Sequence, residues 1–273
     1  MSTVTTMDPA GTKGGSSRVR TTATGRVAAL TRAELTLLVR HKAVLFTALV
    51  LPVALTFAMR PVFDDMDLEK AGLTMGSAVM PMAVAFVLLF GVYSALVTVY
   101  VVRRDELVLK RLRTGEPGDA EILTGTAVAT IAAGLAQCAV LVVAGAAVLG
   151  MEMPENPLLV VVGILLGMVL SGTLAAATTI LTRSAEGSQL TIMPMMLVSM
   201  AGSGVVVPLE MLPDKLASIC ELLPLSPIVE LVRGGWTGQR GAYEALGAVA
   251  TAVAWTVLSG FAVQRYFRWE PRR

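Results

Sequence analysis

The polar chemistry of this chain is concentrated in one charged stretch between two long apolar runs. Residues Val101–Gly125 carry ten of the 42 formally charged side chains. Such a stretch offers charged recognition of a partner protein, unless its basic residues only follow the positive-inside rule. It holds no catalytic set. None of the five lysines follows a glycine, as a phosphate-binding loop requires, and no metal triad or nucleophile elbow is found.

The composition indicates a membrane protein. Of the 273 residues, 55% are hydrophobic and only 15% are charged, whereas soluble domains carry about 25% charged residues. The mean hydropathy is +0.71. The net charge of +2 is too small to indicate a nucleic-acid partner. Cys138 and Cys220 fit neither a disulfide framework nor a metal site.

Six apolar segments are long enough to cross a bilayer core about 30 Å thick as helices. They are Ala43–Met59, Met75–Val102, Ile122–Gly150, Leu158–Leu181, Leu190–Pro208 and Tyr243–Val263. The first is short and contains Pro52. The sequence therefore predicts an all-α membrane protein whose transmembrane domain covers residues 43–263.

The distribution of lysine and arginine predicts the orientation of these helices. With the N-terminus inside, 17 of the 22 basic residues lie in the inner segments. The positive-inside rule then predicts a multi-pass protein of the cell membrane with both termini, including the tail 264–273, in the cytoplasm.

Two further segments precede the first span. Residues 1–25 are rich in Ser, Thr and Gly and lack an apolar core, so they are expected to be a disordered cytoplasmic tail rather than a signal peptide. In Arg26–Lys42, Val27, Leu30 and Leu37 share one helical face. This pattern favours an amphipathic helix in the inner membrane interface, with an ordinary extension of the first span as the alternative.

No ionisable side chain lies well inside the six spans, which disfavours an ion-coupled carrier. The polar and thioether side chains in these spans are typical of helix packing. The alternative, more specific function is that they line a substrate path. The candidates for that path are Gln137, Ser171, Thr178, Met193, Met196, Ser199, Met200 and Ser203.

The charged stretch itself is expected to begin with a helix from Arg103 to Arg113. At helical spacing, Val108, Leu109 and Leu112 fall on one apolar ridge, and Glu106 with Lys110 forms an i,i+4 pair. Gly115, Pro117 and Gly118 then break the helix before the third span.

Two stretches resemble the permease subunits of type-2 ABC exporters, the class that includes daunorubicin-resistance-like and polysaccharide-export permeases. One is RDELVLKRLRTGEPGDAEILTG. The other, GSGVVVPLEMLPDKLASICELLPLSPIVELVRGGWTG, begins at Gly202. The family often has Gly where Leu107 stands here, Pro where Gly115 and Glu116 stand, and Lys where Thr126 stands.

The resemblance implies a coupling helix at about 103–114 that docks on a separate ATP-binding subunit. Two ATP-binding subunits and a second permease chain, identical or different, would complete the exporter in the lipid bilayer. ATP and Mg would bind the partner, and this chain would bind no cofactor. The residues expected to make this contact are Arg104, Asp105, Glu106, Val108, Leu109, Lys110, Arg111, Leu112 and Arg113.

The resemblance also implies a re-entrant segment at about 209–240 that covers the outer exit. Its candidate gate residues are Pro208, Glu210, Pro213, Glu221, Pro224, Pro227, Glu230 and Arg233. The acidic members would gate the exit or pair with Lys215 and Arg233, unless they are ordinary solvated charges.

The function expected from these features is ATP-driven efflux of an apolar or amphiphilic compound, as in drug export and antibiotic resistance, without catalysis by this chain. Four alternatives stay open: export of a polysaccharide or lipid-linked glycan, an ion-coupled secondary carrier, a membrane-integral enzyme, and a membrane component that signals or assembles without transport.

Overall fold

The computed structural model describes residues 74–114, 118–149, 151–203, 213–239 and 241–270, together with Gly25, Arg32, Thr36, Ala54 and Ala58. The predictions for the N-terminal tail, the interfacial helix and the first span therefore fall almost entirely outside the described residues. Pro208 and Glu210 also lie outside them.

Every regular element within these ranges is a helix. They are α4 (Met75–Phe86), η2 (Val87–Ser94), α5 (Ala95–Asp105), α6 (Val108–Arg113), α7 (Asp119–Leu149), α8 (Pro157–Thr179), α9 (Ser188–Gly202), α10 (Asp214–Glu221), α11 (Ser226–Thr237) and α12 (Ala242–Tyr266). The all-helical class is confirmed for this part of the chain.

Four of these helices are long and apolar enough to cross a membrane. They are Met75–Asp105, Asp119–Ala147, Pro157–Thr179 and Ala242–Tyr266, and they match the second, third, fourth and last predicted spans. The described part of the fifth, α9, has 15 residues and does not reach that length. The count of six spans stays a prediction.

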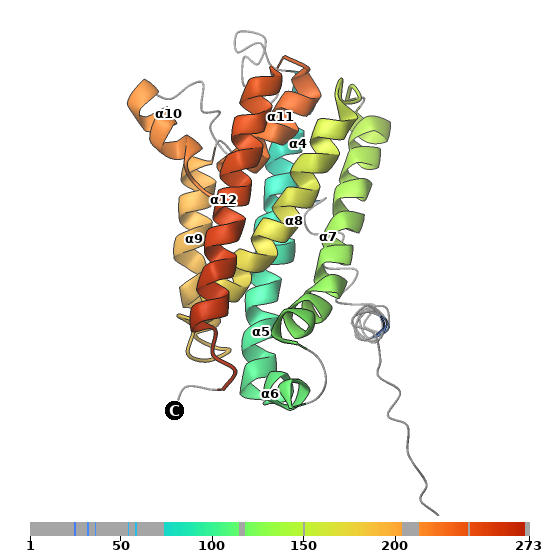
Figure 1. The fold of residues 1–273 in the computed structure, drawn as a ribbon. Helices are drawn as coiled ribbons and strands as arrows, with labels where there is room; N and C mark the ends of the chain where they lie inside the picture. Colours follow the sequence, from blue (N-terminus) through green and yellow to red (C-terminus); the bar gives the residue numbers. More distant parts are fainter. Residues whose placement is uncertain are drawn as a thin grey trace, which may run out of the picture.

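The long helices form a bundle with one short helix, α6, at one end and α10 and α11 at the other (Figure 1). We call these ends the elbow end and the far end. Helix α8 occupies the middle of the bundle and contacts α11, α12, α5, α7 and η2. Much of the surface of the bundle is apolar, with exposed Val143, Val161, Leu197, Val257 and Phe261, as expected for lipid-facing helices.

Two glycines on α8 allow α11 to approach closely. An added Cβ on Gly163 would lie 3.1 Å from Leu231 Cβ, and one on Gly167 would lie 3.0 Å from Ile228 Cγ2. This is the small-xxx-small spacing that lets membrane helices pack at short range. A hydrogen bond at the far end joins α11 to the loop between α7 and α8: the indole N–H of Trp236 donates to Glu152 O at 3.1 Å.

The π-helical segment η2 interrupts the helix Met75–Asp105 near its middle. Within it, Gly91 packs directly against α7: a Cβ there would lie 2.6 Å from Gln137 Oε1. One hydrogen bond then joins η2 to α8, because Tyr93 Oη lies 3.0 Å from Thr178 Oγ1. Segments of π-helix inside longer helices often mark functional positions.

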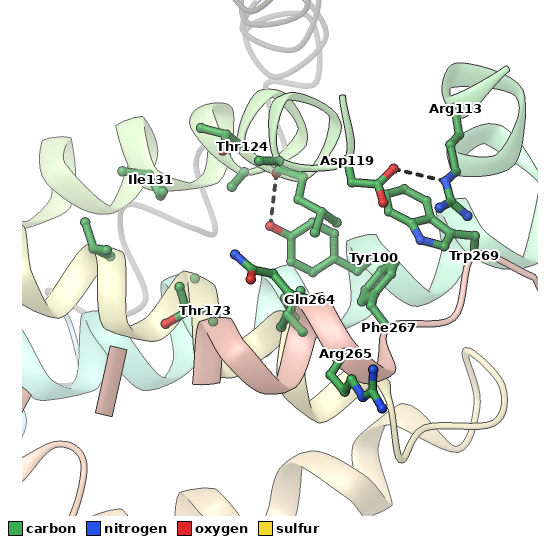
Figure 2. A pocket seen from close by; sticks show the side chains of 18 residues that line it. Tyr100, Arg113, Asp119, Thr124, Ile131, Thr173, Gln264, Arg265, Phe267 and Trp269 are labelled. Carbon is green, nitrogen blue, oxygen red and sulfur yellow. Dashed lines mark hydrogen bonds and ion pairs between the residues drawn. The ribbon is translucent and has the colours of Figure 1, made fainter. Parts of the chain in front are cut away.

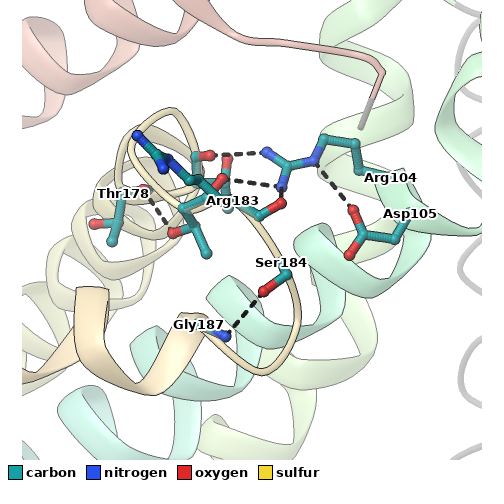
Figure 3. A network of polar contacts seen from close by, with 8 residues as sticks. Arg104, Asp105, Thr178, Arg183, Ser184 and Gly187 are labelled. Carbon is teal, nitrogen blue, oxygen red and sulfur yellow. Dashed lines mark hydrogen bonds and ion pairs between the residues drawn. The ribbon is translucent and has the colours of Figure 1, made fainter. Parts of the chain in front are cut away.

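At the elbow end, the buried side chain of Arg104 connects α5 to the end of α8. Its side chain is 1% exposed. Nη1 donates to Thr179 O at 3.0 Å, and Nη2 donates to Thr182 O at 3.0 Å and to Arg183 O at 3.3 Å. These carbonyls end α8 and begin the turn that follows it (Figure 3). A cation here satisfies orphan carbonyls and complements the negative end of the helix dipole.

The chain turns between α5 and α6 at Leu107, which has φ 60° and ψ 14°. It is the one non-glycine residue with positive φ in the described ranges. This left-handed conformation costs an L-residue about 1–2 kcal/mol relative to glycine. The expectation of one helix from Arg103 to Arg113 is therefore wrong, because the helix is interrupted at Glu106 and Leu107 and restarts as α6 in a new direction (Figure 1).

We expect Leu107→Gly to be more stable than Leu107→Ala by about 1 kcal/mol, because only glycine adopts positive φ without strain. In an ordinary helix the order is reversed, with Ala favoured by about 1 kcal/mol. Unfolding of the purified protein in mixed detergent would measure the difference between the variants. A more stable Ala variant would contradict the left-handed turn.

We expect Arg104→Met to lower the free energy of unfolding by about 2–4 kcal/mol, because it leaves buried carbonyls without their charged donor. The matched control is Arg111→Met, an exposed position at the same end, which should change stability by about 0.5 kcal/mol or less. The same unfolding assay would compare them, and equal effects would refute the capping role of Arg104.

Candidate functional site

The elbow end carries most of the residues that the sequence pointed to, but the structure divides them into an outer and an inner group. The expected surface position is wrong for Arg104, which is buried against the end of α8. It is also wrong for Leu109, which is 0% exposed. The error for Leu109 follows from the turn at Leu107, which rotates α6 relative to the single helix that the periodicity predicted. Arg104 precedes that turn and is buried because α5 packs against the end of α8.

The outer group forms one mixed surface, which we call the elbow face. It consists of Glu106, Leu107, Val108, Arg111 and Leu112. Glu106 and Arg111 are exposed, and neither has an ion-pair partner among the described residues. Leu107 is exposed as well and places an apolar side chain between these charges. An apolar centre with a charged rim is the usual composition of a protein-docking patch.

Leu107 was not among the residues predicted to make this contact. The signal that marks it is the family's frequent glycine at this position, because a recurrent glycine often indicates positive φ. The conformation of Leu107 fits that explanation.

The remaining charges of the predicted docking set are engaged within the chain. Asp105 Oδ1 lies 3.6 Å from Arg104 Nε. Lys110 Nζ lies 2.7 Å from Glu270 Oε1, which replaces the expected pair with Glu106. Arg113 Nε lies 3.0 Å from Asp119 Oδ1.

Residues 267–270, which we call the C-terminal segment, fold back onto α6. The guanidinium of Arg113 lies 4.9 Å from the ring of Trp269, a cation–π distance. Trp269 also packs edge-on against Phe267, with 5.0 Å between ring centroids. Together with Lys110 and Glu270, these contacts connect the last membrane helix to the elbow.

The predicted gate residues that are described lie at or near the far end. Pro213 precedes α10, and Glu221 ends it; both are exposed. Pro224 and Pro227 are buried at the start of α11, Glu230 is half-buried within it, and Arg233 is 8% exposed. Helix α11 is therefore packed into the bundle through ten buried residues, whereas α10 lies at its edge (Figure 1).

The predicted path residues do not gather around one cavity in the described part of the chain. Gln137, Ser171, Ser199 and Ser203 are buried, and Met193 is 58% exposed. Met196 and Met200 pack against the core, and Thr178 bonds to Tyr93. Gln137 Oε1 has no hydrogen-bond partner among the residues that the structure describes. The role of these residues in transport stays a prediction.

Two cavities lie between the described helices. One, of about 390 Å³, is almost wholly apolar and lies between α7 and α8 toward the far end. The other, of about 600 Å³, lies at the elbow end between α5, α7, α8, α12 and the C-terminal segment (Figure 2). We call the second cavity the elbow pocket. No group of three or more metal-ligating side chains occurs within the described ranges.

Comparison with known proteins gives a family for this arrangement. The family model described as ABC-2 type transporter matches residues 26–236, which is most of the chain. A search of curated proteins finds no significant match to this sequence. The chain belongs to the ABC-2 type transporter family and is a membrane permease of that family.

Proposed function

We propose that this chain is the membrane-spanning permease subunit of an ATP-binding cassette exporter, which moves an apolar or amphiphilic compound out of the cell. ATP and Mg bind a separate subunit in this proposal, two copies of which serve a pair of permease chains. The observation that carries it is the elbow face, an exposed apolar and charged patch on a short helix that is rigidly joined to the bundle.

The contacts of the elbow explain how motion at this patch would reach the membrane helices. Helix α6 joins α5 through the two-residue turn at Glu106 and Leu107. Arg104 joins the same corner to the end of α8, and the pair Lys110–Glu270 joins α6 to the segment after α12. Displacement of α6 by a closing ATP-binding subunit would therefore pull on three membrane helices together.

The cargo class follows from the charges of the described spans. Asp, Glu, Lys, Arg and His side chains in these described spans occur only in the end turns, as with Arg104 in α5, Glu121 in α7 and Arg265 in α12. A path without fixed charge favours apolar or amphiphilic cargo, because a highly charged solute would lack partners at membrane depth.

The elbow end faces the cytoplasm in this proposal. Its described basic residues are Arg103, Arg104, Lys110, Arg111, Arg113, Arg183, Arg265 and Arg268, whereas Lys215 and Arg233 belong to the far end. The positive-inside rule supports this orientation.

We expect Leu107→Asp and Arg111→Glu each to reduce recovery of a co-expressed ATP-binding subunit by about tenfold or more, because each disrupts the centre or the rim of the elbow face. Co-purification with the subunit encoded by the adjacent reading frame would measure this. Lys215→Glu, an exposed charge reversal at the far end, is the control and should leave recovery unchanged. Equal recovery from all three variants would reject docking at the elbow face.

We also expect single cysteines at Arg111 and Lys215 to react from opposite sides of the membrane. In a background with Cys138→Ala and Cys220→Ala, Lys215→Cys should be labelled by an impermeant maleimide in intact cells. Arg111→Cys should be labelled only after permeabilisation. The reverse pattern would overturn the orientation.

A further inference from the structure

The elbow pocket has an apolar interior and a polar mouth. Its buried wall includes Ala127 of α7 and Ala176 of α8. Its mouth is formed by Gln264, Arg265, Phe267 and Trp269 (Figure 2). A volume of about 600 Å³ is within the usual range for sites that hold a small molecule. This division of polarity suits an amphiphile whose tail enters and whose headgroup stays at the mouth.

The space in the pocket comes from missing side chains rather than from movable ones. A Cβ on Gly260 would meet nothing within 4 Å, and one on Gly172 would meet only Leu96 Cδ1, at 3.9 Å. Ala176 adds another short side chain from α8.

The mouth has an excess positive charge. The charges of Arg113 and Asp119 balance each other at 3.0 Å. Arg265 is exposed and has no hydrogen-bond or ion-pair partner among the described residues. Its guanidinium points away from the cavity interior (Figure 2), which places it beside a headgroup rather than beside a tail. Basic pockets between membrane helices are the sites at which anionic lipid headgroups bind.

Aromatic side chains complete the mouth of the pocket. Phe267 and Trp269 pack edge to face beside Arg113, and aromatic rings are enriched where apolar core meets headgroups.

We propose that the elbow pocket binds one membrane lipid with an anionic phosphate headgroup, its acyl chain between α7, α8 and α12 and its phosphate beside Arg265. The inference requires only that the elbow end lies at a membrane surface, so it does not depend on an ATP-binding partner. The bound lipid would contact the C-terminal segment and through it the elbow.

Native mass spectrometry of the purified full chain, delipidated and then given phosphatidylglycerol or phosphatidylcholine, would test this site. We expect one retained phosphatidylglycerol per chain, favoured over phosphatidylcholine by about fivefold or more, the contribution of one arginine near a headgroup. Inorganic phosphate at the same concentration should not displace it, which separates a lipid site from a phosphate site. No preference between the two lipids, or displacement by phosphate, would overturn the proposal.

Two variants and their matched controls identify the pocket as the site. Gly260→Leu should fill the cavity and abolish retention of both lipids, whereas Gly247→Leu, also in open space on α12, should not. Arg265→Gln should remove the preference for the anionic lipid, whereas Arg268→Gln, an exposed neighbour, should keep it. Retention by Gly260→Leu equal to wild type would refute the pocket as the site, and thermal unfolding of each variant would verify its folding.

Discussion

The burial of one guanidinium group organises the elbow end of this protein. A cation withdrawn from water must exchange its hydration for protein oxygens, and Arg104 does so with three carbonyls at and beyond the end of α8. Charge-assisted hydrogen bonds of this kind contribute about 1.5–3 kcal/mol each. Because α6 begins four residues after Arg104, the direction of the elbow relative to α8 depends on this anchor.

Helix α8 is held differently at its two ends, and the difference follows from the local environment. Toward the far end, Gly163 and Gly167 let α11 approach until side-chain and backbone atoms touch, so the attachment is made by packing. At the elbow end the attachment is polar and directional, through Arg104.

The sequence was sufficient to locate four apolar helices, because the length and hydropathy of a span are local properties. It also located a charged elbow between the second and third spans. It failed to predict the burial of Leu109, because a helical wheel assumes an uninterrupted helix and the positive φ at Leu107 breaks that assumption. It failed to predict the burial of Arg104 because that burial depends on the packing of α5 against α8, which is distant in sequence. The pairing of Lys110 with Glu270 and the assembly of the elbow pocket join residues that are distant in sequence. No periodicity within one segment encodes such contacts.

The contacts between α6 and the C-terminal segment can form only late in the synthesis of the chain. Helix α6 leaves the ribosome early, after the helix Met75–Asp105, but Trp269 and Glu270 follow only after α12. The elbow therefore gains its last internal contacts only when every described membrane helix has been synthesised.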